Sequence, residues 1–156
     1  MISHTIKYEL RKDPFVTIIN QFGEIEINLE NQIIFPHGMI GMPDCKHFCL
    51  ANINVEKFKY FKLLQGVVDT KLSFLTLPIL IHNKFIDSSD LEKACNVLGI
   101  KVEDVAILLI ASTKITDEGK KIVVNARAPI FIDSTAKAAI QYVIPETKYN
   151  IQHIID

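Results

Sequence analysis

Hydrophobic and polar residues alternate along much of this chain. From Glu24 to Glu30 they alternate at every position, which is the period of a strand with one wet face and one buried face. The run from Val105 to Ala111 is apolar throughout, which predicts a central strand buried on both faces. Short β-branched or aromatic runs between turn residues predict further strands. They are Val16–Ile19, Gln32–Phe35, Phe48–Ile53, Phe58–Leu64, Leu72–Leu77, Val105–Ser112, Lys121–Asn125, Ala128–Asp133 and Ala139–Ile144.

Two turns are predicted between these strands. Asn31 allows a turn that would make Gln32–Phe35 the hairpin partner of Glu24–Glu30. Asp117-Glu118-Gly119-Lys120 separates two other strands and is typical of a hairpin turn.

One segment has the period of a helix instead. Between Ser88 and Gly99 the apolar residues recur on one helical face, at Leu91, Ala94, Cys95 and Leu98. Ser89 stands where an N-cap belongs, with Glu92 placed as in a capping box, and Gly99 stands at the usual C′ position. The pattern predicts a helix over residues 89–98. Its apolar stripe either plugs the open end of a barrel, which we favour, or faces a partner helix.

Short strands with frequent turns and one short helix predict the fold class. They favour a mainly β, antiparallel, closed or nearly closed barrel-like fold, because closure leaves no strand edge open to aggregation. The length of 156 residues favours one domain. We expect a single β-barrel-like domain over residues 15–156, preceded by an N-terminal extension over residues 1–14 that ends at Pro14.

The most informative local feature is the segment from Phe35 to Gly41. A strand-like run stops at Pro36, and Gly38 and Gly41 follow. Proline fixes φ and lacks a backbone donor, whereas glycine permits positive φ, so we expect a shaped loop that ends a strand. The segment contains no nucleophile, no charge cluster and no metal-binding pattern. Its role is therefore interpreted as architectural.

Composition narrows the function classes. The chain has 17 basic and 18 acidic residues, and only two of the basic residues, Arg11 and Arg127, are arginine. Nucleic-acid binding usually needs a basic face with arginine contacts, so direct nucleic-acid binding is not expected. The longest apolar run is too short for a membrane-spanning helix, and no signal-peptide pattern is present. Three cysteines do not make a disulfide framework, which favours a soluble cytoplasmic protein with reduced thiols.

Cys45, His47 and Cys49 place three possible metal ligands close together in the sequence. Structural zinc usually takes four ligands in paired units, and a second pair is missing because Cys95 stands alone on the helix. The favoured interpretation is that Cys49 is a small core residue and that His47 is exposed. No nucleophile elbow or phosphate-binding loop occurs either, so no catalytic, metal-binding or cofactor-binding residue is predicted.

The segment Asn125-Ala126-Arg127-Ala128-Pro129 interrupts two strand-like runs. Pro129 limits strand pairing, which implies an edge, a bulge or a sharp corner. The segment is either a structural corner or an exposed site where a strand or helix of a partner docks.

Several short motifs follow one another along the chain in a characteristic order. They are Thr17, Phe22-Gly23-Glu24-Ile25-Glu26, Phe35-Pro36-x-Gly38-x-x-Gly41, Phe48, Leu50, Phe61, Leu64-Gln65, Phe74, Pro78, Asn125-x-x-Ala128-Pro129-Ile130, Gln141 and Tyr149-Asn150-Ile151. Their order and spacing resemble the flagellar assembly factor FliW family from about Thr17 to His153. The chain departs from the usual family pattern at Met42, Gly66 and Ala126, where the family often has Phe, Ser and Leu.

The resemblance implies a non-enzymatic, β-barrel-like cytoplasmic protein of bacterial flagellum biogenesis. Members of the family bind flagellin, as a chaperone would, and also bind the translational regulator CsrA and relieve its repression of flagellin mRNA. Free flagellin competes for the factor, so filament demand is coupled to flagellin synthesis. A monomer without cofactor, metal or membrane contact is expected.

Four residues are predicted to contact partners, namely Gln65, Asn125, Arg127 and Pro129. The prediction combines the resemblance with the tendency of loops and strand interruptions to carry recognition. Two other interpretations stay open. One is a barrel that binds a small apolar ligand, which the hydrophobic content of 49% favours. The other is a metal-dependent hydrolase that uses Cys45, His47 or Cys49.

Overall fold

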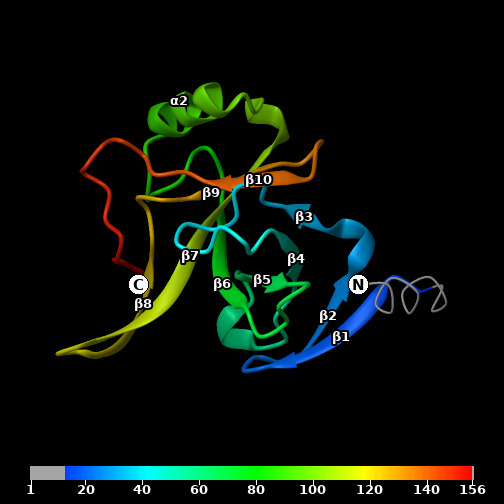
Figure 1. Ribbon diagram of the computed structural model, residues 1–156. Helices are drawn as coiled ribbons and strands as arrows, with labels where there is room; N and C mark the ends of the chain where they lie inside the picture. The colour runs from blue at the N-terminus through cyan, green and yellow to red at the C-terminus, as the bar shows by residue number, and fades with distance from the viewer. Residues whose placement is uncertain (1–12, 156) are drawn as a thin grey trace.

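The computed structural model describes residues 13–155, and most of its regular elements are β-strands (Figure 1). The strands are β1 (Phe15–Asn20), β2 (Gly23–Asn28), β3 (Ile33–Ile34), β4 (His47–Ala51), β5 (Lys62–Gly66), β6 (Ser73–Ile79), β7 (Val105–Thr116), β8 (Gly119–Val124), β9 (Ile130–Asp133), β10 (Ala138–Gln141) and β11 (His153–Ile155). The helices are α2 (Ser88–Leu98) and the short 3-10 helices η1 (Leu29–Asn31), η2 (Glu56–Phe58) and η3 (Val102–Asp104). The predicted extension over residues 1–14 lies almost wholly outside the described residues, so the domain boundary stays a prediction.

Seven strands close into a ring. The order runs β7, β6, β5, β4, β3, β10 and β9, and β9 pairs with β7 again. Neighbouring strands are antiparallel except β10 and β3, which meet in parallel at Ala138 and Ile34. The predicted barrel-like fold is therefore confirmed, with one parallel joint. The hydrophobic pattern does not reveal that joint, because it links segments about a hundred positions apart in the sequence.

The ring separates two hydrophobic cores. Alternate residues of a strand point to opposite faces, so Leu63 of β5 packs in the larger core and Leu64 packs in the smaller one. Every strand of the ring contributes to the smaller core and α2 does not, so this core fills the interior of the ring. Its buried members are Ile33, Phe35, Met39, Phe48, Leu64, Leu108, Ile130, Ile132 and Ala139, with Phe74 of β6 packed against them. An interior filled in this way is a core, which removes the support for a small ligand inside the ring.

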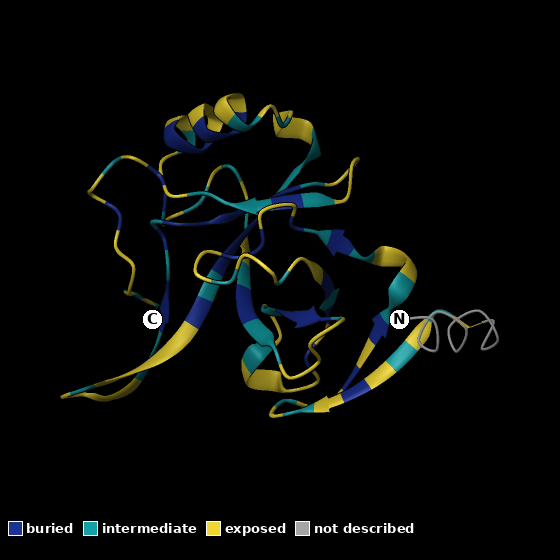
Figure 2. Ribbon diagram, in the orientation of Figure 1, coloured by how far each residue is buried: buried dark blue, intermediate teal, exposed yellow. Residues whose placement is uncertain are grey.

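The larger core packs on the outer faces of most ring strands. Figure 2 marks the buried residues along the ribbon in dark blue. The β1–β2 hairpin packs on this core through Ile25 and Ile27, which are buried as the alternation predicts. The partner of β2 differs from the prediction, because β2 pairs with β1 whereas β3 pairs with β4. Asn28 ends the strand: its side chain accepts a hydrogen bond of 3.0 Å from the Glu30 N–H and starts η1. The predicted hairpin between Glu24–Glu30 and Gln32–Phe35 is therefore wrong.

Other strand boundaries shift for local reasons. In the predicted strand Phe58–Leu64, the N–H of Phe58 bonds to the Val55 carbonyl in η2, so β5 begins only at Lys62. β9 begins at Ile130, directly after Pro129, because proline has no N–H to donate to a neighbouring strand. β11 was not predicted, since three residues are too few to show a period.

β7 has two halves with different surroundings. Ile107 and Leu109 are buried in the larger core and Leu108 in the interior of the ring, which confirms the predicted central strand. From Ser112 onwards the strand is exposed and pairs with β8 across the turn Asp117-Glu118. The predicted hairpin turn is confirmed, and the hairpin projects from the body of the molecule (Figure 1).

Helix α2 covers one side of the larger core (Figure 1). Leu91, Ala94 and Cys95 are buried in that core, and Leu98 packs against it. Complete burial of Leu91 stabilises the fold by about 1.5–3 kcal/mol. The stripe therefore faces the core and not a partner helix. It lies outside the ring, so the expected plug of an open end is wrong.

The C-terminal end of α2 agrees with the prediction, whereas the N-cap residue does not. Gly99 takes the C′ position with a left-handed φ of 72°, as expected. The N-cap is Asp87 instead of Ser89, and it makes no side-chain capping bond. No helix within residues 13–155 is long and apolar enough to cross a membrane.

The Phe35–Gly41 segment is a loop that packs on the interior of the ring. Phe35 and Met39 are buried there, and Met39 and Met42 exchange backbone hydrogen bonds of 3.1 and 2.8 Å. Gly38 has a φ of +68°, and a Cβ at this position would lie 2.5 Å from the Met42 carbonyl oxygen. Only glycine fits this turn, which is the physical basis of the architectural role predicted for the segment.

Candidate partner-binding surface

The segment Asn125–Pro129 forms a corner between β8 and β9. Oδ1 of Asn125 accepts hydrogen bonds from the backbone N–H groups of Arg127 and Ala128, both at 3.0 Å. Asparagine stabilises turns in this way. The predicted structural corner is therefore present. Pro129 is buried within it, whereas Asn125 and Arg127 are half-buried.

Two segments from later in the chain are hydrogen-bonded to this corner. The chain after β10 contributes the N–H of Ile144, which donates to the Arg127 carbonyl at 2.8 Å. The C-terminal region contributes the Asn150 carbonyl, which accepts from the Ala126 N–H at 3.0 Å. The backbone of the corner is thus held from both sides, and the side chains that it presents are held with it.

Gln141 connects the corner to the Phe35–Gly41 loop. Its Nε2 donates to the Ala128 carbonyl at 3.3 Å, and its Oε1 accepts from the Ile40 N–H at 3.1 Å. Ile40 and Gln141 are 101 positions apart in the sequence. Gln141 belongs to the ordered motif series but was not predicted as a site residue, because only the folded chain shows what its side chain joins.

Three exposed apolar residues are bonded to Gln141 or stand next in sequence to residues that are hydrogen-bonded to the corner. They are Ile40, Val143 and Ile151, which are 52%, 48% and 59% exposed. Arg127 forms no ion pair with residues 13–155. Apolar groups around an arginine are typical of protein–protein interfaces. We call Asn125, Arg127, Ile40, Val143 and Ile151 the corner surface.

Gln65 lies apart from the corner and is fully buried. Its Nε2 donates to the carbonyls of Thr70 at 2.8 Å and Gly66 at 3.1 Å, and its Oε1 accepts from Asn20 Nδ2 at 2.9 Å. It therefore ties the loop over residues 67–72 to β5 and to the β1–β2 hairpin. Neither Gln65 nor Pro129 is exposed, so neither side chain is available for direct contact with a partner.

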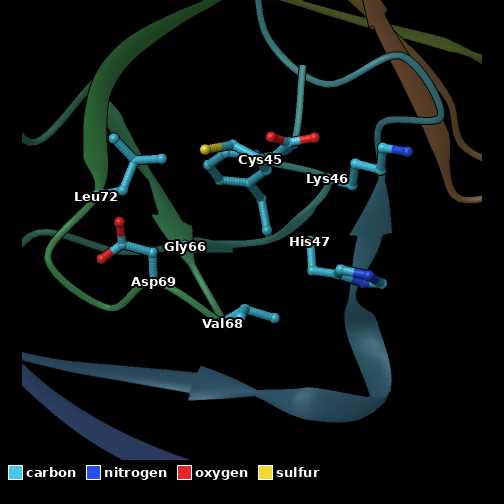
Figure 3. Close-up of a pocket in the computed structure, with 9 residues that line it drawn as sticks. Cys45, Lys46, His47, Gly66, Val68, Asp69 and Leu72 are labelled. Atoms are coloured by element: carbon cyan, nitrogen blue, oxygen red, sulfur yellow. The ribbon is translucent and has the colours of Figure 1, made fainter. Parts of the chain in front are cut away.

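A surface pocket of about 320 Å³ lies beside this loop (Figure 3). It is formed by the chain that enters β4 and by the chain that leaves β5, with Cys45, His47, Gly66, Val68 and Leu72 among its walls. A Cβ on Gly66 would lie 2.3 Å from the Asp69 carbonyl oxygen, so the loop packs directly on the backbone of β5. The glycine that departs from the family pattern is what permits this close packing.

The three candidate metal ligands are not gathered around a common point. Cys49 is buried, with its Sγ 3.5 Å from the Asn28 carbonyl oxygen, and His47 is exposed, as the favoured interpretation predicts. Figure 3 shows the side chains of Cys45 and His47 pointing apart. Burial raises the pKa of the Cys49 thiol to about 11, which disfavours the thiolate form that binds metals. Within residues 13–155 no three His, Cys, Asp or Glu side chains are grouped to hold a metal ion.

A charged cluster joins the C-terminal region to the start of α2. Asp90 is buried and accepts a hydrogen bond from the Tyr149 hydroxyl, while Lys148 Nζ lies 3.3 Å from Asp90 and 2.7 Å from Asp87. The Tyr149 bond is the main cause that lowers the pKa of Asp90, and Lys148 adds to it. Burial first, and then the bond to Asp90, raises the pKa of Tyr149. The cluster anchors the chain next to Asn150, the residue that holds the corner.

Comparisons with a family model, with curated proteins and with solved structures all point to the same family. The chain matches the family model described as FliW protein over residues 17–155. It is 33% identical over 137 residues to the flagellar assembly factor FliW of Alkaliphilus metalliredigens, covering 86% of this chain and 82% of that protein. It is 29% identical over 135 residues to the flagellar assembly factor FliW of Natranaerobius thermophilus, covering 85% and 86%. Its fold is similar to a crystal structure of the flagellar assembly factor FliW, with a TM-score of 0.63 at 23% identity, covering 89% of this chain and 96% of that one.

Proposed function

Because this chain belongs to the FliW family of flagellar assembly factors, we propose that it binds flagellin and the translational regulator CsrA in the cytoplasm. By binding CsrA it relieves repression of flagellin synthesis, and free flagellin competes for the same factor. Synthesis of flagellin is thereby coupled to filament assembly. The protein acts as a monomer and by binding alone, in keeping with relatives that are named as assembly factors, a non-catalytic role.

The match to the family over residues 17–155 is the observation that carries this proposal. The hydrogen bonds around the corner add a physical argument for where a partner binds. Motif residues from three parts of the chain hold the backbone of the corner. They are Gln141, Asn150 and the Asn125–Pro129 segment itself. The family signature thus supports a single exposed surface, and we assign partner binding to it.

Arg127 is the central polar group of this surface. Its guanidinium offers a fork of donors that fits a carboxylate, and no acidic residue within 13–155 pairs with it. Ile40 and Val143 supply apolar area that a partner would bury. Asn125 keeps its side chain engaged with the backbone of the corner, so it positions Arg127 and need not touch the partner itself. Gln65 and Pro129 are buried, so they influence binding only by holding the neighbouring backbone in place.

The first test is calorimetric titration of the protein with flagellin and with CsrA from the same organism. We expect each to bind with a dissociation constant below about 10 μM, and flagellin to displace CsrA or to weaken its binding. If neither protein binds at that level, the proposed function is wrong. If both bind but do not influence each other, the coupling is wrong while the binding role stands.

The second test locates the site. Arg127→Glu should weaken binding of at least one partner by about tenfold to a hundredfold, as for an arginine near the centre of an interface. The unfolding temperature should stay near that of the parent, because the Arg127 side chain is half-buried and forms no ion pair with residues 13–155. Lys101→Glu makes the same charge reversal at an exposed position outside the corner surface and serves as the matched control. Equal effects of the two variants would place the binding site elsewhere.

A further inference from the structure

A groove of about 390 Å³ lies along the projecting β7–β8 hairpin. It runs between the hairpin and the chain around η2, at the far end of β8 from the corner surface. Three lysines line it together with three large apolar residues: Lys57, Lys120, Lys121, Phe61, Ile122 and Ile155. We call it the lysine groove.

The strand register determines which side chains form its wall. Thr113 lies opposite Ile122, and Ile115 lies opposite Lys120, so all four point to the same face of the hairpin. β11 adds Ile155 beside Ile122 on that face. The partly buried Ile122 and Ile155 line the groove, and the same face continues beyond it to Ile115 near the tip, which is 86% exposed. Lys120 stands within this apolar strip.

Among residues 13–155, no acidic side chain forms an ion pair with the lysines that line the groove, Lys57, Lys120 and Lys121. Nζ of Lys57 lies 5.5 Å from the centre of the Phe58 ring, a contact that leaves its charge in place. Asp117 and Glu118 are at the tip of the hairpin and do not line the groove. Lys57 and Lys120 thus flank an apolar floor, whereas the side chain of Lys121, which lies opposite Lys114, points to the other face of the hairpin.

We propose that the lysine groove binds an extended segment of a partner protein that carries both acidic and large apolar residues. The positive charge of the groove favours acidic residues in the partner segment, and the apolar floor favours hydrophobic residues in it. The pairing of β11 with β8 ends at Ile122, so Lys120 and Lys121 have no outer strand partner among residues 13–155. An extended segment can add hydrogen bonds along this edge.

A nucleic acid suits the groove less well than a protein segment. Recognition of single strands uses exposed aromatic rings for base stacking, and Phe61, the aromatic residue in the lining, is only partly exposed. Its polar side chains include lysines but no arginine. This surface is distinct from the corner surface, and the proposal does not depend on the identity of the flagellar partners.

The test uses a synthetic peptide in which glutamate alternates with leucine, titrated into the full chain labelled with ¹⁵N. We expect amide shifts to change around Thr113, around Lys120–Ile122 and between Lys57 and Phe61. A peptide in which lysine replaces glutamate should not bind. The double variant Lys57→Gln with Lys120→Gln should weaken binding of the acidic peptide about tenfold, as expected for the loss of two exposed ion pairs.

The matched control removes the same charge outside the groove. Lys101→Gln with Lys114→Gln should leave the affinity unchanged, because Lys114 points to the opposite face of the hairpin and Lys101 lies at η3. Equal weakening by both pairs would overturn the proposal, since only net charge would then matter. Shifts confined to other residues would also overturn it, as would tighter binding of a short polyuridine RNA to the same residues. None of these results bears on whether flagellin or CsrA binds the corner surface.

Discussion

Replacing Gln65 with methionine is expected to loosen the loop over residues 67–72 and to lower the stability of the fold. Gln65 is fully buried, and its amide joins two separate segments through Asn20 Nδ2 at 2.9 Å and the Thr70 carbonyl at 2.8 Å. Methionine is similar in length and volume but can make neither bond. The substitution therefore tests the hydrogen bonds while it largely preserves the packing.

The size of the stability loss in Gln65→Met depends on the hydrogen-bonding groups that lose their partner. Within residues 13–155, Asn20 Nδ2 and the Thr70 carbonyl have no second partner, whereas the Leu72 carbonyl keeps the N–H of Gly66 at 2.7 Å. A lost hydrogen bond costs about 0.5–1.5 kcal/mol net, and more where the remaining group stays buried. Because Thr70 is exposed and Asn20 half-buried, water can replace part of what is lost. We expect a loss of about 2–3 kcal/mol, or roughly 5–10 °C in the unfolding temperature for a chain of this size.

The assay is urea unfolding followed by circular dichroism, combined with amide hydrogen exchange. The amides of Gly66 and Leu72, which bond to the carbonyls of Leu72 at 2.7 Å and Asp69 at 3.1 Å, should exchange faster in the variant. Gln21→Met is the matched control, since Gln21 is exposed in the β1–β2 turn. A stability loss below about 0.5 kcal/mol with unchanged exchange would refute the reasoning, because it would show that the buried amide contributes nothing beyond its volume.

Two further predictions concern the same loop and the α2 cluster. Gly66→Ala would place a Cβ 2.3 Å from the Asp69 carbonyl oxygen, so we expect a loss of about 1–3 kcal/mol in urea unfolding and altered amide shifts for residues 67–72. Unaltered shifts would contradict it. The bond from Tyr149 lowers the pKa of Asp90, so ionised Asp90 stabilises the fold above its ordinary pKa of about 3.9, and this contribution disappears as the pH falls through the lower folded value. The unfolding temperatures of the parent and Asp90→Asn should therefore differ most near about pH 7 and converge in acid. If the difference between the two unfolding temperatures did not vary with pH, ionised Asp90 would not be the stabilising group.

Local periodicity was enough to predict the elements whose environment is set by their own residues. The alternation around Ile25 and Ile27, the two-sided burial of Leu108 and Leu109, and the stripe that contains Leu91 all follow from which faces must avoid water. Gly99 was predictable for a similar reason, since glycine alone takes a left-handed φ at a helix C-terminus without strain.

Pairing between distant segments was not predictable in this way. The hairpin expected for Glu24–Glu30 was wrong because two strands of similar pattern could each pair with it, and the capping bond of Asn28 turned the chain away. The parallel joint of β3 and β10 depends on segments about a hundred positions apart. No single-strand pattern carries that information.

For the candidate site too, local features were predictable and contacts between distant segments were not. The interruption of two strands at Asn125–Pro129, and the preference of its proline and asparagine for a corner, could be predicted from the residues alone because those side chains act on the adjacent backbone. The burial of Gln65 and Pro129, and the link from the corner to Ile40 through Gln141, became visible only once the folded chain was known. Burial and side-chain hydrogen bonds depend on which distant segments meet, and closure of the ring brings these segments together.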